Sequence, residues 1–141
     1  MMVSTKGRNA LRIMIDLAQH AGEGYISLSD IAKRQYTSLK YMEAIVSILN
    51  KAGFVESQRG KDGGYRLTRA PEKYTIGSIL KLTEGSLAPI SCSEFGSAAS
   101  GKAACEQAGS CITFPMWHHL DEIIDGYLER ITLADLIAGN V

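Results

Sequence analysis

The sequence of 141 residues has few prolines, few cysteines and no long apolar run, and each of these features excludes a class of protein. Only three prolines are present, which argues against a low-complexity or collagen-like chain. With three cysteines, at least one thiol stays unpaired in any intramolecular disulfide scheme. The N-terminus has no apolar run of signal-peptide length, and no segment approaches the roughly 20 apolar residues that span a bilayer. We therefore expect a compact cytoplasmic protein whose thiols stay reduced.

A net charge of zero also argues, at first sight, against a nucleic-acid partner, but the two halves of the chain differ. Residues 1–70 carry 11 Lys and Arg against 6 Asp and Glu, a net charge of +5. Residues 71–141 carry 4 against 9, a net charge of −5. This asymmetry is typical of a basic binding half joined to an acidic regulatory or assembly half.

The basic half predicts three helices. Apolar residues line one face from Gly7 to Gln19, and Gly22 and Gly24 follow as the predicted end of that helix. Ser27 and Asp30 form an S-x-x-D capping box that begins a second, short helix. A third helix begins after Ser38 and ends at Gly53. The predicted buried positions of the first and third helices are Ala10, Ile13, Met14, Leu17 and Ala18, then Met42, Ile45, Val46, Leu49 and Ala52.

Polar and small side chains mark the opposite face of the third helix near its N-terminus, namely Lys40, Tyr41, Glu43, Ala44 and Ser47. A short helix, a tight turn and a second helix of this kind predict a helix-turn-helix, in which the second helix enters the major groove of DNA. The alternative is a pair of packed helices without a special role.

A β-hairpin follows directly, since FVESQ and YRL are strand-like and the intervening RGKDGG is a turn. Arg59 and Lys61 lie at the tip, and Gly60 allows the backbone there to approach a ligand closely. Cations at a hairpin tip beside a recognition helix suit phosphates or the minor groove, as in the wing of a winged helix. A solvated basic turn is the alternative.

Three stretches resemble the Rrf-type winged-helix family of bacterial regulators, which includes the IscR, NsrR and CymR class. They are STKGRNALRIMIDLA, SLSDIAKRQ with the following YMEAI, and RGKDGGYRLTR. The resemblance continues through TIGSILKLTEG to the terminal ITLADLI. It implies a homodimer that binds pseudo-palindromic operators. It also implies an iron-sulfur cluster held by three cysteines, with oxygen, nitric oxide or cluster status as the signal.

The resemblance implies DNA contacts for a set of residues in the third helix and the wing: Ser38, Lys40, Tyr41, Glu43, Arg59 and Gly60. Lys40, Arg59 and Lys61 would supply salt-sensitive affinity that does not depend on base sequence. Glu43 is repelled by phosphate, so its place on this face is best explained by a hydrogen bond from cytosine N4. Otherwise it is an ordinary charge on a helix surface.

All three cysteines, Cys92, Cys105 and Cys111, lie in one segment rich in Ser, Gly and Ala. Thiolates suit iron-sulfur clusters or zinc, but the segment has no C-x-x-C pair of the kind typical of structural zinc. We predict an iron-sulfur cluster, [2Fe-2S] or [4Fe-4S], on these residues. The fourth-ligand positions that the family implies hold Arg8 and Phe114, which leaves Glu94, Glu106, His118, His119 or an external ligand.

The acidic half ends in a predicted helix, residues 115–129, with an apolar stripe at Met116, Leu120, Ile123, Ile124 and Tyr127. It resembles the dimerisation helix of the family, and packing within the monomer is the alternative. Thr132 and Asp135 cap a last short turn. We thus expect a mainly α fold with one small β-hairpin, divided into a winged helix-turn-helix (residues 1–84), a cysteine-containing sensor loop (85–113) and a dimerisation region (114–141).

Two other functions stay open. A cluster-free repressor of the same fold would respond through cysteine oxidation or a partner protein. An enzyme would need a polarised nucleophile, and the sequence has no Cys-His-Asn spacing, G-x-S-x-G turn or phosphate loop. We therefore predict no enzymatic activity and no membrane partner.

Overall fold

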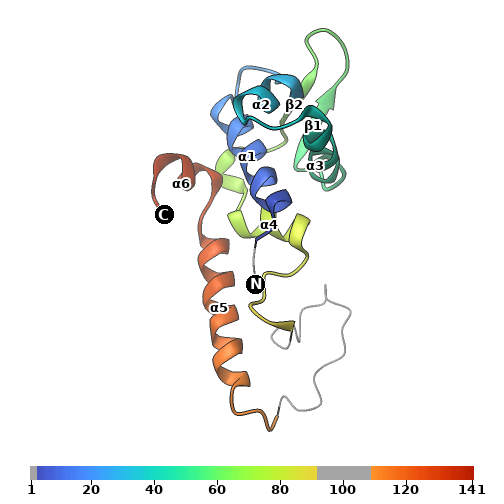
Figure 1. Ribbon diagram of the computed structural model, residues 1–141. Helices are drawn as coiled ribbons and strands as arrows, with labels where there is room; N and C mark the ends of the chain where they lie inside the picture. Colours follow the sequence, from blue (N-terminus) through green and yellow to red (C-terminus); the bar gives the residue numbers. More distant parts are fainter. Residues whose placement is uncertain (1–2, 92–108) are drawn as a thin grey trace.

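The computed structural model describes residues 3–91 and 109–141 (Figure 1). The N-terminal part contains helices α1 (Thr5–Gln19), α2 (Leu28–Arg34) and α3 (Leu39–Lys51) and strands β1 (Val55–Gln58) and β2 (Gly64–Leu67). The 3-10 helix η1 (Pro71–Lys73) and the helices α4 (Ile76–Glu84), α5 (Phe114–Arg130) and α6 (Leu133–Ala138) follow. The predicted mainly α fold with one β-hairpin is confirmed.

Side-chain hydroxyl groups of Ser and Thr cap the N-termini of most of these helices. The side chain that precedes the helix accepts a hydrogen bond from a first-turn backbone N–H in α1, α2, α3, α4 and α6, at Ser4, Ser27, Ser38, Thr75 and Thr132. Because Ser4 caps α1, that helix begins two residues before the predicted start at Gly7. It also ends at Gln19, before Gly22 and Gly24. Both halves of a capping box form at Thr132 and Asp135, whereas the hydrogen bond described at Ser27 is its acceptance from Asp30 N, at 3.1 Å.

The hairpin strands pair antiparallel, with Val55 opposite Leu67 and Gln58 opposite Gly64. Ile26, just before α2, extends this sheet through two 2.8 Å hydrogen bonds with the backbone of Tyr65. Gly64 has φ +151°, and a Cβ on it would lie 2.1 Å from the Ile26 carbonyl oxygen. Glycine is required at this position because the backbone of the wing lies directly against the backbone that leads into the helix-turn-helix.

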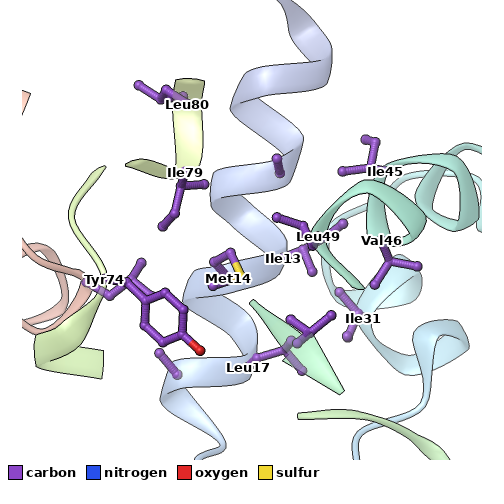
Figure 2. Close-up of a cluster of buried hydrophobic side chains, with 14 of the residues drawn as sticks. Ile13, Met14, Leu17, Ile31, Ile45, Val46, Leu49, Tyr74, Ile79 and Leu80 are labelled. Atoms are coloured by element: carbon purple, nitrogen blue, oxygen red, sulfur yellow. The ribbon is translucent and has the colours of Figure 1, made fainter. Parts of the chain in front are cut away.

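The hydrophobic core surrounds α1, which lies between α3 and α4 (Figures 1 and 2). Ile13, Met14 and Leu17 of α1 are buried against residues from the other elements (Figure 2): Ile31, Ile45, Val46, Leu49, Tyr74, Ile79 and Leu80. The predicted core positions of α1 and α3 are confirmed with one exception. Ala52 is exposed, because α3 ends at Lys51 and the chain turns away there.

Helix α5 extends away from this core in Figure 1, and none of its residues is fully buried. It spans one residue more at each end than the predicted 115–129. Ile131 and Leu133, which follow it, are buried, and Ile76 N donates to Ile131 O at 2.8 Å. The C-terminal segment thus returns to the winged helix and completes its core. Within the described residues, no helix has the length and apolar character needed to cross a membrane.

Candidate nucleic-acid interface

The turn between α2 and α3 sets the direction of the predicted recognition helix. Thr37 N donates to Ala32 O at 3.0 Å, which closes the turn. Tyr36 has φ +53°, in the left-handed region, and its side chain is 98% exposed. The left-handed conformation of a non-glycine residue costs about 1 to 2 kcal/mol, so the conformation of Tyr36 lowers the stability of the fold.

Three of the four contact residues predicted at the start of α3, including the capping residue Ser38, face solvent. Ser38, Lys40 and Glu43 are exposed. Ser38 Oγ also caps α3 by accepting from Tyr41 N at 3.3 Å. Tyr41 is half-buried and packs against the core, which differs from its predicted outward orientation. The first turn of α3 is thus held to the core through the Tyr41 ring, while its outer face stays open.

A buried carboxylate holds the helix-turn-helix onto α1. Asp16, 2% exposed, accepts hydrogen bonds from Arg34 Nη2 at 2.6 Å and Arg34 Nε at 2.9 Å, and from Gln35 Nε2 at 3.3 Å. Burial of the Asp16 carboxyl favours a raised pKa, but the hydrogen bonds from Arg34 and Gln35, with the charges of Arg34 and His20, outweigh it and lower the pKa. The carboxylate is therefore ionised at neutral pH and fixes the end of α2 and the start of the turn.

The wing places its three predicted contact residues, Arg59, Gly60 and Lys61, at the exposed tip of the hairpin. Gly60 has φ +114°, a conformation that only glycine adopts readily. Tyr74 fastens the base of the wing, because its hydroxyl accepts from Thr68 N (3.0 Å) and Arg69 N (3.1 Å) and donates to Phe54 O (2.7 Å). The basic tip thus extends from a rigid base beside α3.

Comparison with known proteins identifies the family of this chain. Residues 3–139 match the model of the Rrf2 family, described as an iron-dependent transcriptional regulator. The chain belongs to the Rrf2 family. It is 38% identical to the HTH-type transcriptional regulator IscR of Photobacterium profundum over 140 residues, 99% of this chain and 77% of that protein.

Two solved structures share the Rrf2 fold with this chain. T. potens IscR has a TM-score of 0.76 at 38% identity, covering 100% of this chain and 89% of that one. CymR, the global cysteine regulator of B. subtilis, has a TM-score of 0.73 at 36% identity, covering 98% and 97%. The chain is therefore a winged-helix transcriptional regulator of the Rrf2 family, whose members are DNA-binding regulators and not enzymes.

Of the cysteines predicted as cluster ligands in this Rrf2 protein, the structure describes Cys111. Cys92 and Cys105 lie outside the described residues, as do Glu94 and Glu106. The Cys111 thiol is exposed, and its Sγ lies 3.3 Å from Thr113 Oγ1. Hydrogen bonds from the side chain and backbone of Thr113, and from the backbone of Phe114, lower the pKa of Cys111 and favour the thiolate.

The two histidines weighed as a fourth ligand, His118 and His119, lie in the first turns of α5. Their Nδ1 atoms are 3.7 and 3.6 Å from the carboxylate oxygens of Glu122. Among residues 3–91 and 109–141, no three metal-ligating side chains come together.

Sequence reasoning missed the residues that position this interface. Asp16 contacts Arg34, 18 residues away in the sequence. The Tyr74 hydroxyl joins Phe54, 20 residues away, to the nearer Thr68 and Arg69. The one available signal for Asp16 was its place beside Leu17 on a mainly apolar helix face.

Proposed function

We propose that this Rrf2 regulator binds duplex DNA with the N-terminal half of α3 in the major groove and the wing tip on the adjacent backbone or minor groove. The observation that carries this is the joint exposure of the α3 surface and the cationic hairpin tip on elements fixed by Asp16 and Tyr74. Rigid supporting contacts matter because base readout requires well-oriented side chains.

Different contact residues have different proposed roles. Lys40, Arg59 and Lys61 bind phosphates and supply affinity. Glu43 accepts from a cytosine amino group and supplies sequence preference. Ser38, Tyr41 and Gly60 contribute through the Ser38 hydroxyl, the phenol edge of Tyr41 and the close approach of the Gly60 backbone.

We propose that the protein acts in the bacterial cytoplasm as a homodimer on pseudo-palindromic operators, with α5 as the dimerisation helix of region 114–141. On α5, Met116, Ile123 and Tyr127 are 55%, 54% and 44% exposed, and Leu120 is 37% exposed. Large apolar side chains repeated on one helix face favour an interface. Two recognition helices could then reach major grooves one helical turn, about 34 Å, apart or a multiple of that distance.

The cysteine segment, residues 85–113, is the proposed sensor. Cys92, Cys105 and Cys111 would hold an iron-sulfur cluster, and the exposed Cys111 with its lowered pKa fits such a group, because iron binds thiolates. When bound, the cluster would supply a redox-active iron centre open to oxygen or nitric oxide. Thr113 would hold the Cys111 sulfur as a thiolate.

Described contacts connect the sensor segment to the DNA-binding half. Glu84, the last residue of α4 before the segment, accepts hydrogen bonds from Ser4 N at 3.1 Å and Ser4 Oγ at 2.5 Å. Ser4 caps α1, so a shift of residues 85–91 would reach the helix on which α3 rests. A coupling of about 1 to 3 kcal/mol would change DNA occupancy by one to two orders of magnitude.

A second candidate is a cluster-free regulator that responds through the Cys111 thiol. The observations that favour it are the exposure and lowered pKa of Cys111, which are typical of redox-sensitive thiols, together with the similarity to CymR. Iron and sulfide analysis of protein purified without oxygen separates the two: stoichiometric iron supports the cluster. Iron-free protein with a sulfenic acid or disulfide at Cys111 after mild oxidation supports the second candidate.

DNA binding itself is tested by fluorescence anisotropy over a range of salt concentrations. Lys40→Gln and Arg59→Gln should each weaken binding to every duplex and lower the salt dependence, whereas Glu43→Gln should change the preference among duplexes. Glu23→Gln, in the exposed loop after α1, is the control. If the wild type shows no salt-dependent binding to any duplex, the proposed function is wrong.

A further inference from the structure

A cleft of about 640 Å³ lies between the N-terminal half of α1 and the turn that leads into α3. Arg8 and Arg12, one helical turn apart on α1, line one wall. Tyr36, Ser38 and Tyr41 line the other. The cleft is therefore continuous with the start of the proposed recognition helix.

Among the residues that the structure describes, no acidic side chain lines this cleft. Arg8 Nη2 donates to Thr5 Oγ1 at 3.1 Å and Arg12 Nη1 donates to Asn9 Oδ1 at 3.5 Å, so both partners are neutral. In the described part of the chain neither arginine has a carboxylate within ion-pair distance, unlike Arg34. Two exposed guanidinium groups side by side repel each other unless an anion is placed between them.

The opposite wall of the cleft adds to the positive electrostatic potential of the two arginines. The N-terminus of α3, a helix of 13 residues, opens at the cleft with its partial positive charge. Tyr36 stands at the same wall in its left-handed conformation, with its ring almost fully exposed. Backbone conformations of this kind are concentrated at binding sites.

We propose that this cleft seats a backbone phosphate of duplex DNA, held by Arg8 and Arg12, on the strand that flanks the groove entered by α3. The inference rests on the proposed function, because it adds a third contact surface to α3 and the wing. Guanidinium groups bind phosphate oxygens through paired hydrogen bonds, and a phosphate contact beside a recognition helix fixes the register of that helix on the duplex. Arg8 and Arg12 are thus assigned a positioning role that carries no base preference.

The test uses the full-length protein and a duplex of mixed sequence, about three helical turns or about 30 base pairs long. The double variant Arg8→Gln with Arg12→Gln should lower the slope of log K against log salt by about 0.9 for each protomer bound, because it removes one phosphate contact, and each single variant should lower it by part of that amount. At 0.1 M salt this corresponds to about eightfold weaker binding per contact, since one contact scales as the −0.9 power of molar salt. The loss should be equal for duplexes of different sequence.

Two controls separate a seated phosphate from general attraction. Lys6→Gln removes the same charge from an exposed residue of α1 that does not line the cleft, and it should change the slope much less. The double variant Arg8→Lys with Arg12→Lys keeps the charge and should retain most of the slope while losing part of the affinity. Circular dichroism checks that each variant is folded.

Three results would overturn the inference. The first is wild-type affinity and slope in both glutamine variants while Arg59→Gln binds weakly, an outcome that leaves the proposed function intact. The second is an equal loss in Lys6→Gln. The third is calorimetric binding of inorganic phosphate that requires Arg8 and Arg12 while DNA binding does not, which would assign the cleft to a free anion.

Discussion

The hydrogen bonds between Asp16 and Arg34 allow the sharpest test of how this interface is supported. Asp16→Asn keeps the size of the side chain but replaces one acceptor oxygen with an NH₂ group that faces the Arg34 guanidinium. Each bond to a charged group contributes about 1.5 to 3 kcal/mol, and Asp16 accepts two from Arg34. Arg34 is 39% exposed and can turn toward water, which reduces the loss. We expect the free energy of unfolding to fall by about 2 to 3 kcal/mol.

The assay is urea denaturation followed by circular dichroism, in which this loss should lower the midpoint by about 1 to 2 M. Because folding lowers the pKa of Asp16, its contribution is fully present above its ordinary value of 3.8 and is lost as the pH falls through the folded value. The difference between wild type and variant should therefore be largest at neutral pH and shrink below about pH 4.

Asp30→Asn is the matched control, because Asp30 undergoes the same chemical change at an exposed site on α2. It should change the free energy of unfolding by less than about 1 kcal/mol, the usual contribution of an acidic residue in the first turn of a helix. If Asp16→Asn were as stable as this control, or if its loss of stability did not depend on pH, the reasoning would be refuted. Weaker DNA binding by folded Asp16→Asn would also show that the contact orients α3.

Tyr74→Phe removes the hydroxyl that joins three backbone groups, so we expect it to cost about 1 to 3 kcal/mol in urea denaturation and to speed proteolysis within the wing. Gly64→Ala should displace the hairpin and weaken DNA binding, because its Cβ would collide with the Ile26 carbonyl; a wild-type affinity would contradict this. Gly126→Ala, which has open space in α5, should instead raise stability by about 0.5 to 1 kcal/mol. Ile123→Glu should shift sedimentation from dimer to monomer, and an unchanged dimer would count against α5 as the interface.

Local signals in the sequence were sufficient for most of the secondary structure. Ser38 and Thr132 begin helices because a hydroxyl at that position satisfies a backbone N–H a few residues later. The spacing of Ile45, Val46 and Leu49 identified the buried face of α3, since a helix repeats every 3.6 residues. Errors occurred at helix ends, where a neighbouring cap such as Ser4 extends a helix beyond its apolar pattern.

The sequence by itself therefore determined the order of elements, the wing and most of the exposed face of α3, Tyr41 excepted, because these depend mainly on interactions between residues close in the chain. Only the tertiary structure decided that Asp16 fixes the helix-turn-helix, that Tyr74 fastens the wing and that Arg8 and Arg12 share a cleft with the start of α3. Those contacts join residues from separate elements. Their formation depends on how α1 packs against the rest of the core, and no local pattern of residues encodes that packing.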